Sequence, residues 1–174
     1  MTRAPLAILT CTVFAAALAS CATPAGPRAG ATLAPTAGSA VTGSVQFVQS
    51  AGKVLVSGEI RGLKPNAEHG FHVHEKGDCS SPDGMSAGGH FNPTGTAHGN
   101  HDMGEHHAGD LRVLKADANG VATFRYESST ISVGSGVTDI VGRGLIVHRD
   151  PDDFKTQPTG NSGPRLACAV VARG

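Results

Sequence analysis

The sequence predicts an all-β fold, an antiparallel Greek-key β-sandwich or flattened barrel that carries two long functional loops. Three observations support this prediction. Glycine is abundant, with 24 residues in a chain of 174, and aromatic residues make up only 4%, which suits short strands joined by many turns. Short segments alternate apolar and polar residues, and no segment keeps a helical periodicity. Seven or eight short strands at such spacing are typical of sandwiches and barrels.

The strands are predicted to follow one another from Val41 onward. Residues 41–47 alternate apolar and polar side chains, and Lys53–Arg61 (KVLVSGEIR) repeats the pattern. Alternate residues of a strand point to the same face, so each segment can bury one face in a core. Residues 62–66 (GLKPN) then supply a turn. Further strands are predicted at 69–74, 111–115, 121–126, 144–148 and 166–171, with a hairpin signal at 117–120 (DANG).

Two segments interrupt this series of strands, residues 76–109 and residues 149–164. Long segments without regular structure are uncommon in a small domain, and those that occur usually carry function. Five of the nine histidines of the chain lie between His90 and His107, inside the first of these loops. The sequence therefore predicts that the two loops form the functional part of the molecule.

The first 40 residues are predicted to serve export and attachment. Residues 1–20 have one cation, Arg3, and an apolar run too short to span a bilayer, which favours a secretory signal peptide. Residues 18–21 (LASC) resemble the lipobox of bacterial lipoproteins, which implies cleavage before Cys21 and a lipid on its thiol; an ordinary signal peptide is the alternative. Residues 21–40 are mostly Ala, Pro, Gly and Thr, so we expect a flexible tether and a folded domain over 41–174.

The lipobox resemblance also implies a location. A lipid on Cys21 would attach the protein to the periplasmic face of a bacterial membrane. Ala22 follows Cys21 and is not a retention signal of the Asp type, which favours the outer membrane over the inner one.

Histidines at strand spacing predict a metal site. His72 and His74 lie two residues apart in a predicted strand, so both imidazoles can reach one ion. His148 ends another apolar strand and can supply a third nitrogen. Imidazole suits zinc and copper alike, and three imidazoles with one carboxylate suit tetrahedral zinc. Spacing alone leaves the number of metals open, because more candidate donors lie in the first loop and just after it, namely His90, His98, His107 and Asp110.

Two cysteines, Cys79 and Cys168, belong to the predicted domain and lie far apart in the sequence. In an exported domain such a remaining pair indicates one disulfide. The alternative is two unrelated buried thiols.

Four segments together resemble the copper/zinc superoxide dismutase family. Residues 70–79 (GFHVHEKGDC) resemble its first signature, and residues 160–168 (GNSGPRLAC) resemble its second. Residues 89–93 (GHFNP) and 107–111 (HAGDL) resemble its zinc-loop segments. The likeness runs in order from Val41 to the end, and the short loop before His90 is closer to bacterial members.

The resemblance implies one copper ion and one zinc ion per subunit. The implied copper ligands are His72, His74, His90 and His148. The implied zinc ligands are His90, His98, His107 and Asp110, so His90 would bridge the two ions. The resemblance also implies that Asp152 hydrogen-bonds to one ligand of each metal and that Cys79 and Cys168 form a disulfide. His69 is expected to have a structural hydrogen bond, whereas His101 and His106 match no ligand position and are expected to face solvent.

The function that the resemblance implies is dismutation of superoxide, with Arg165 and His90 as catalytic residues. The alternative is a non-catalytic periplasmic carrier of copper and zinc on the same fold, and the presence of both His148 and Arg165 favours the enzyme. Nucleic acid is excluded as a partner, because 14 basic residues are balanced by 14 acidic ones without a basic run. The resemblance leaves a monomer and a homodimer both open.

Overall fold

The computed structural model describes Met1 and residues 26–174. Its strands are all antiparallel where they pair, and the only helical element of the described residues is a single 3-10 turn at Met85–Ala87. This confirms the predicted all-β fold. The strands are β1 (Arg28–Pro35), β2 (Thr42–Ser50), β3 (Lys53–Arg61), β4 (Glu68–His69), β5 (Phe71–His74), β6 (Leu114–Lys115), β7 (Ala122–Ser128), β8 (Gly144–His148), β9 (Arg165–Val170) and β10 (Ala172–Arg173).

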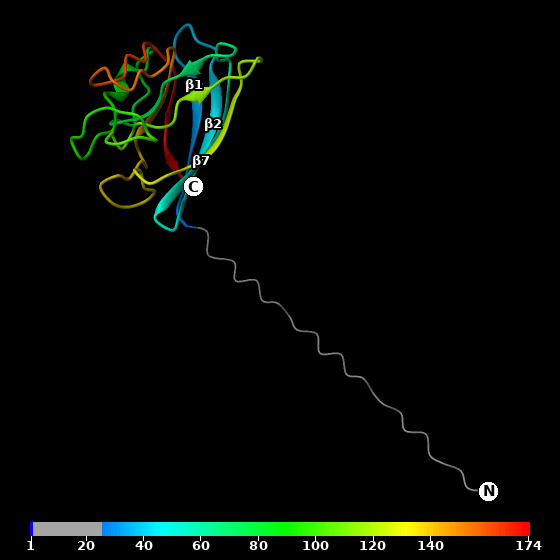
Figure 1. Ribbon diagram of the computed structural model, residues 1–174. Coiled ribbons are helices and arrows are strands. Elements are labelled where there is room, and N and C mark those ends of the chain that lie inside the picture. Colours follow the sequence, from blue (N-terminus) through cyan, green and yellow to red (C-terminus); the bar gives the residue numbers. More distant parts are fainter. Residues whose placement is uncertain (2–25) are drawn as a thin grey trace.

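The main sheet runs in the order β5-β8-β9-β1-β2-β3-β7, with β10 beside β1, while β4 and β6 form a small second sheet. The sheet curls around one core (Figure 1). The predicted alternation decides which face is buried, since Val45 and Phe47 of β2 and Val54, Val56 and Ile60 of β3 are all 0% exposed. These branched and aromatic side chains form the apolar interior against which β5 and β8 pack.

Strand β1 corrects the predicted tether. Its first part pairs with β2, and its last two residues, Ala34 and Pro35, pair with β9. The alternate residues Ala29, Ala31 and Leu33 are buried in the core. The expectation that residues 21–40 form a flexible linker is therefore wrong from Arg28 onward. Alanine has a weak strand preference, so the local sequence gave little signal, and β1 is held by the neighbours on both of its edges.

The lipidated Cys21 and the signal peptide over residues 1–20 are predictions that lie outside the described residues, apart from Met1. Within residues 26–174, no helix has the length and apolar character that crossing a bilayer requires.

The two long loops lie on the same side of the sheet (Figure 1). Gln157 of the second loop fastens them together, because its side chain accepts a hydrogen bond from the His98 backbone N–H at 2.9 Å and donates one to the His98 carbonyl at 3.0 Å. The predicted disulfide between Cys79 and Cys168 is confirmed, and it ties the first loop to β9 with a Cα–Cα distance of 5.8 Å. Both loops are thus fixed to the sheet and to each other.

The role of β1 predicts a stability effect at Leu33. Leu33→Ala should lower the free energy of unfolding by about 2–4 kcal/mol, because it leaves a cavity in a buried position. Thr32→Ala, at the exposed neighbouring position, should change it by less than about 0.5 kcal/mol. Urea unfolding of both variants tests this; equal, negligible effects would show that the segment is a linker after all.

Candidate metal centre

Strand β5 presents two histidines to the loops. His72 and His74 are alternate residues of β5 and point the same way, as predicted. His148 ends β8, which pairs with β5. The pairing of β8 with β9 becomes irregular after Val147, so His148 lies at a shift in register. Isolated backbone bridges join His72 to Asp110 and His74 to His90. These bridges bring the first loop alongside the strand.

The structure brings the seven predicted ligand residues into two adjoining sets. In each set, the candidate donor atoms lie within 4.8 Å of one another, and every side chain is buried. His90 belongs to both sets. The first set is His72, His74, His90 and His148, and the second is His90, His98, His107 and Asp110.

Hydrogen bonds fix which nitrogen of each ring in the first set is free. His74 donates through Nδ1 to the Gly88 carbonyl at 2.9 Å, and His148 donates through Nδ1 to the Gly163 carbonyl at 3.1 Å. A carbonyl only accepts, so Nε2 of each neutral ring keeps its lone pair. The two Nε2 atoms lie 3.4 Å apart. These two nitrogens are therefore prepared to bind one ion.

Two further ring nitrogens of the first set have no hydrogen-bond partner. His72 Nδ1 and His90 Nε2 are both buried and unpaired. Buried polar atoms are almost always paired, and an unpaired one needs an explanation. A metal ion bound by the first set would satisfy both nitrogens at once.

The second set has the dimensions of a tetrahedral zinc site. Zinc–nitrogen bonds of about 2.0–2.1 Å in a tetrahedron place neighbouring donors about 3.3–3.4 Å apart. His90 Nδ1 and His107 Nδ1 lie 3.4 Å apart. Asp110 oxygens lie 2.8 Å from His90 Nδ1, 3.0 Å from His98 Nδ1 and 3.3 Å from His107 Nδ1. The residues present fit a zinc ion.

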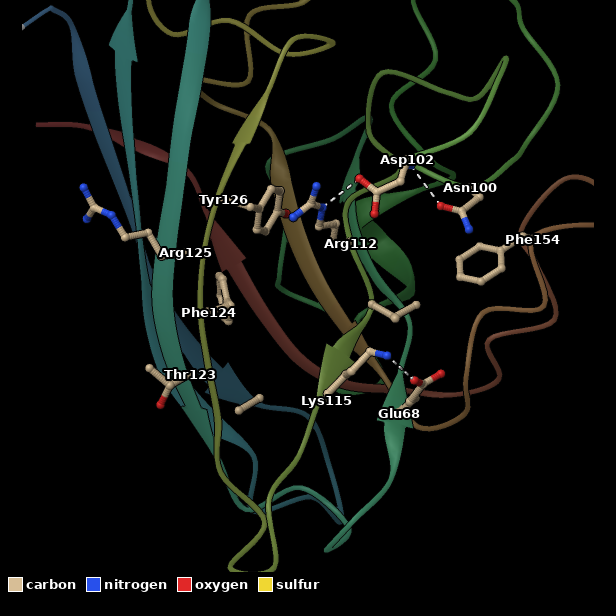
Figure 2. Close-up of a pocket in the computed structure, with 12 residues that line it drawn as sticks. Glu68, Asn100, Asp102, Arg112, Lys115, Thr123, Phe124, Arg125, Tyr126 and Phe154 are labelled. Atoms are coloured by element: carbon tan, nitrogen blue, oxygen red, sulfur yellow. Dashed lines mark hydrogen bonds and ion pairs between the residues drawn. The ribbon is translucent and has the colours of Figure 1, made fainter.

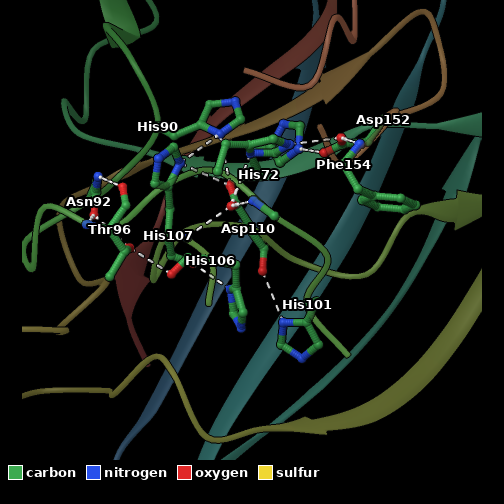
Figure 3. Close-up of polar contacts among 12 residues, drawn as sticks. His72, His90, Asn92, Thr96, His101, His106, His107, Asp110, Asp152 and Phe154 are labelled. Atoms are coloured by element: carbon green, nitrogen blue, oxygen red, sulfur yellow. Dashed lines mark hydrogen bonds and ion pairs between the residues drawn. The ribbon is translucent and has the colours of Figure 1, made fainter. Parts of the chain in front are cut away.

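The Asp152 carboxylate joins the two sets. Its Oδ2 lies 2.6 Å from His72 Nε2, and its Oδ1 lies 2.9 Å from His98 Nε2 (Figure 3). The Phe154 backbone N–H donates to the same Oδ1 at 2.8 Å. Because a carboxylate accepts, both ring nitrogens must carry protons, which leaves the Nδ1 atoms of His72 and His98 free to bind a metal ion.

Burial keeps His74, His90 and His148 neutral, the form that binds a metal ion. Burial lowers the pKa of His74 and of His148 well below the usual value, and neighbouring rings lower both further. The pKa of His90 falls to about 4, chiefly through burial. His98 differs, because hydrogen bonds to Asp110 and Asp152 outweigh its burial and raise its pKa to about 9. A positive charge is therefore favoured between these two carboxylates, and a bound cation would supply it.

Arg165 is held beside the first set by the same carbonyl that positions His74. Its guanidinium donates to the carbonyls of Gly84 and Gly88, both at 2.5 Å. The Gly88 carbonyl also accepts from His74. Arg165 is one of the nearby charges that lower the pKa of His74, after burial, His148 and His90. Arg165, which the resemblance implies as a catalytic residue, therefore lies next to the predicted copper ligands.

Sequence reasoning missed Gln157 and Gly160. Gln157 holds both backbone groups of His98, and no local pattern marks a glutamine for that role. Gly160 has φ of +62°, and a Cβ there would lie 2.0 Å from Asp152 Oδ1 and 2.5 Å from His98 Nε2. A side chain at position 160 would therefore break the bond between Asp152 and His98. Gly160 begins the segment 160–168, which resembles the second signature. Asp152, its neighbour in space, lies outside that segment.

The remaining histidines have structural contacts. His69 is buried, and its Nδ1 donates to the His148 carbonyl at 2.9 Å, as expected of a structural hydrogen bond. His101 and His106 are only half-buried, and their Nδ1 atoms point to backbone carbonyls. The expectation that both rings face solvent is therefore only partly met.

Comparison with known proteins identifies relatives. The family described as copper/zinc superoxide dismutase (SODC) matches residues 41–171. A Cu-Zn superoxide dismutase of Paramecium bursaria Chlorella virus 1 is 47% identical over 138 residues, 75% of this chain and 72% of that protein. Superoxide dismutase (Cu-Zn) 2 of Aquifex aeolicus is 36% identical over 135 residues, 75% and 79% of the two chains. The copper chaperone for superoxide dismutase of Rattus norvegicus is 42% identical over 140 residues, 76% of this chain but 49% of that protein.

The Asp152 bridge predicts a shared effect on both metals. Asp152→Asn should weaken zinc and copper binding about 10- to 100-fold, because an amide offers one acceptor oxygen and cannot orient both rings. Competition with a chromophoric chelator measures each affinity. Glu127→Gln, an exposed carboxylate on β7, is the matched control and should bind both ions like the parent.

Gly160→Ala offers a second test of the same bridge without changing any ligand. Its methyl group would displace Asp152 from His98, so it should weaken binding in the same direction as Asp152→Asn. Parent-like affinities for both variants would mean that the bridge does not position the ligands.

Proposed function

The chain belongs to the copper/zinc superoxide dismutase family, and we propose that it converts superoxide to dioxygen and hydrogen peroxide with His90 and Arg165 as catalytic residues. The family uses copper and zinc. One observation carries the proposal: two buried donor sets share His90. A site that only stored metal would need neither the shared ring nor an arginine beside the first set.

We assign each metal by the chemistry of its donors. The all-nitrogen set of His72, His74, His90 and His148 suits copper, and the set of His90, His98, His107 and Asp110 suits zinc. Copper, when bound, supplies the one-electron oxidation and reduction that the dismutation of two superoxide anions requires.

His90 is placed to hold and transfer a proton. Its Nδ1 faces the second set, 2.8 Å from Asp110, while its Nε2 faces the first set and has no hydrogen-bond partner. The ring therefore stays fixed from the Nδ1 side while Nε2 takes up a proton and releases it to the reduced substrate. General acid–base transfer of this kind needs a donor within hydrogen-bond reach of the reacting oxygen.

Arg165 supplies the positive charge for the substrate anion. Two carbonyls hold its guanidinium in place, so little reorganisation is needed when an anion arrives. A guanidinium stays protonated at all physiological pH values and offers several donors to a small anion. We therefore assign Arg165 to binding superoxide beside His74 and His148.

A non-catalytic metal carrier is the second candidate, because copper chaperones for superoxide dismutase are also relatives at 41–42% identity. Each matches over only 49% of its own length. Both His148 and Arg165 are present here, and a carrier has no use for an anion-docking arginine. Tight binding of both metals by a parent protein without superoxide consumption would favour the carrier.

We also propose that Cys21 carries a lipid that attaches the protein to the periplasmic face of a bacterial membrane, with the outer membrane favoured. The support is the sequence LASC at residues 18–21 after an apolar run, followed by Ala22. With the folded domain beginning near Arg28, only a few residues would separate the lipid from the sheet.

Activity measurements on protein loaded with both metals test the catalytic role of Arg165. Arg165→Ala should lower kcat/KM for superoxide about 10- to 100-fold with unchanged metal content, because the anion loses its charged partner. The kcat/KM of Arg165→Lys should lie between those of the parent and Arg165→Ala, since lysine keeps the charge without the planar donor pair. Arg125→Ala, an exposed arginine of β7, is the control. Equal rates for the parent and Arg165→Ala would refute the assignment.

Metabolic labelling with a radioactive fatty acid in a bacterial host tests the anchor. The parent chain should incorporate label and sediment with membranes, because acylation needs the Cys21 thiol. Cys21→Ser should abolish both effects, whereas Cys11→Ser, inside the predicted signal peptide, should leave them intact. Unlabelled parent protein released in soluble form would leave the ordinary signal peptide as the explanation.

A further inference from the structure

His101 and His106 form a pair of imidazoles outside both donor sets. Their ring centroids lie 5.4 Å apart with an angle of 49° between the ring planes. His90 and His107, and likewise His98 and His107, are also 5.4 Å apart between centroids. These latter pairs belong to the set that fits one zinc ion. The separation of His101 and His106 is therefore one at which two imidazoles can share an ion.

Backbone carbonyls orient both rings. His101 donates through Nδ1 to the Asp110 carbonyl at 2.9 Å, and His106 donates through Nδ1 to the His107 carbonyl at 2.7 Å. Since a carbonyl only accepts, the proton of each neutral ring is on Nδ1 and the lone pair is on Nε2. Neither Nε2 has a hydrogen-bond partner within residues 26–174. Both rings remain half-buried rather than enclosed, so an ion can reach them from solvent.

Figure 3 shows the two rings beside each other, on the opposite side of Asp110 from His90. The pair thus lies outside both donor sets, on the far side of Asp110 from His90.

Side-chain contacts with Arg112 and Tyr126 hold this part of the loop in place. Arg112 donates to the Asp102 carboxylate at 2.7 Å and stacks over the Tyr126 ring at 4.9 Å. His101 packs against the same ring at 5.5 Å between centroids. Asp102, Arg112 and Tyr126 line a cavity of about 720 Å³ between β6 and β7 (Figure 2). The His101 ring is therefore already packed in place, which lowers the entropy cost of ordering a site. The Asp102 carboxylate is paired with Arg112.

We propose that His101 and His106 form a surface site that binds a divalent transition-metal ion through their two Nε2 atoms, with water completing the coordination. Imidazole ligands suit Cu(II), Ni(II) and Zn(II), and affinity in the divalent series is greatest for Cu(II). Short histidine-rich tracts often bind metals, and residues 98–107 (HGNHDMGEHH) are such a tract. This site would be additional to the two buried ones.

The same hydrogen bonds couple the surface site to the buried one. The two carbonyls that orient His101 and His106 belong to Asp110 and His107, which are both in the zinc set. An ion that cross-links the outer rings would restrain the chain between the zinc ligands, so zinc should leave more slowly. By linkage, filling either site should favour filling the other. This coupling depends on zinc being held as proposed above, whereas binding at the surface site does not.

Equilibrium dialysis of the full chain, loaded with one copper and one zinc ion, against Cu(II) tests the surface site. The parent should take up one further copper ion, detected by elemental analysis and by a second Cu(II) signal in electron paramagnetic resonance. His101→Asn and His106→Asn should each weaken this uptake at least about 10-fold. Asparagine keeps a donor near the position of Nδ1 and removes Nε2, so the loop contacts are retained.

Met103→Leu is the matched control in the same loop. Met103 is exposed, and a thioether is a poor ligand for Cu(II), so this variant should bind the further ion like the parent. Any Cu(II) bound elsewhere on the chain is common to all variants and cancels in the comparison. Loss of uptake in both histidine variants supports the site; loss in only one, or in neither, overturns it.

Exchange of the bound zinc for isotopically labelled zinc tests the coupling, because a chelator for zinc would also remove Cu(II). With the surface site filled by Cu(II), the parent should release zinc several-fold more slowly than His101→Asn combined with His106→Asn. Equal rates would overturn the coupling, while the dialysis result would still decide the binding site.

Discussion

The carboxylate of Asp152 is the contact on which the arrangement of the centre depends. It lies in the second long loop, yet it accepts from His72 on β5 and from His98 in the first loop. One buried carboxylate thus connects three segments that are far apart in the sequence. A buried carboxylate is costly unless it is fully hydrogen-bonded, and the Phe154 N–H gives it a third donor. The pKa of Asp152 lies well below its usual value, because the hydrogen bonds to His72 and His98 outweigh its burial.

The disulfide and Arg165 extend this restraint to the side of the first donor set. Cys79 and Cys168 are separated by 89 residues in sequence, and closing such a loop removes about 4–5 kcal/mol of conformational freedom from the unfolded chain in the chain-entropy account. The bridge fastens the start of the first loop to β9, the strand that begins with Arg165. The Gly84 and Gly88 carbonyls that hold Arg165 follow Cys79 along the same loop. The disulfide and the Arg165 hydrogen bonds therefore both hold the first loop against β9.

A long loop can carry a precise site only when its backbone groups have partners. Here those partners are often the side chains in and around the two donor sets. The Gly88 carbonyl serves His74 and Arg165, the Gly163 carbonyl serves His148, and the carbonyls of Asp110 and His107 serve His101 and His106. Each carbonyl fixes the tautomer of a ring and the position of a loop segment together. The histidines of the chain are consequently oriented by backbone more than by other side chains.

The sequence by itself predicted the all-β fold, because strand alternation is a local property. It also predicted the ligand candidates and the pairing of Cys79 with Cys168, through the resemblance of four short segments to a known family. It did not determine β1, because Ala29 and Ala31 carry little local preference and the strand exists only through its ladders with β2 and β9. It also gave no sign that Gln157 would hold His98 or that Gly160 must lack a side chain beside Asp152. Such contacts join residues far apart in the chain, and only the tertiary structure decides which backbone groups and carboxylates they meet.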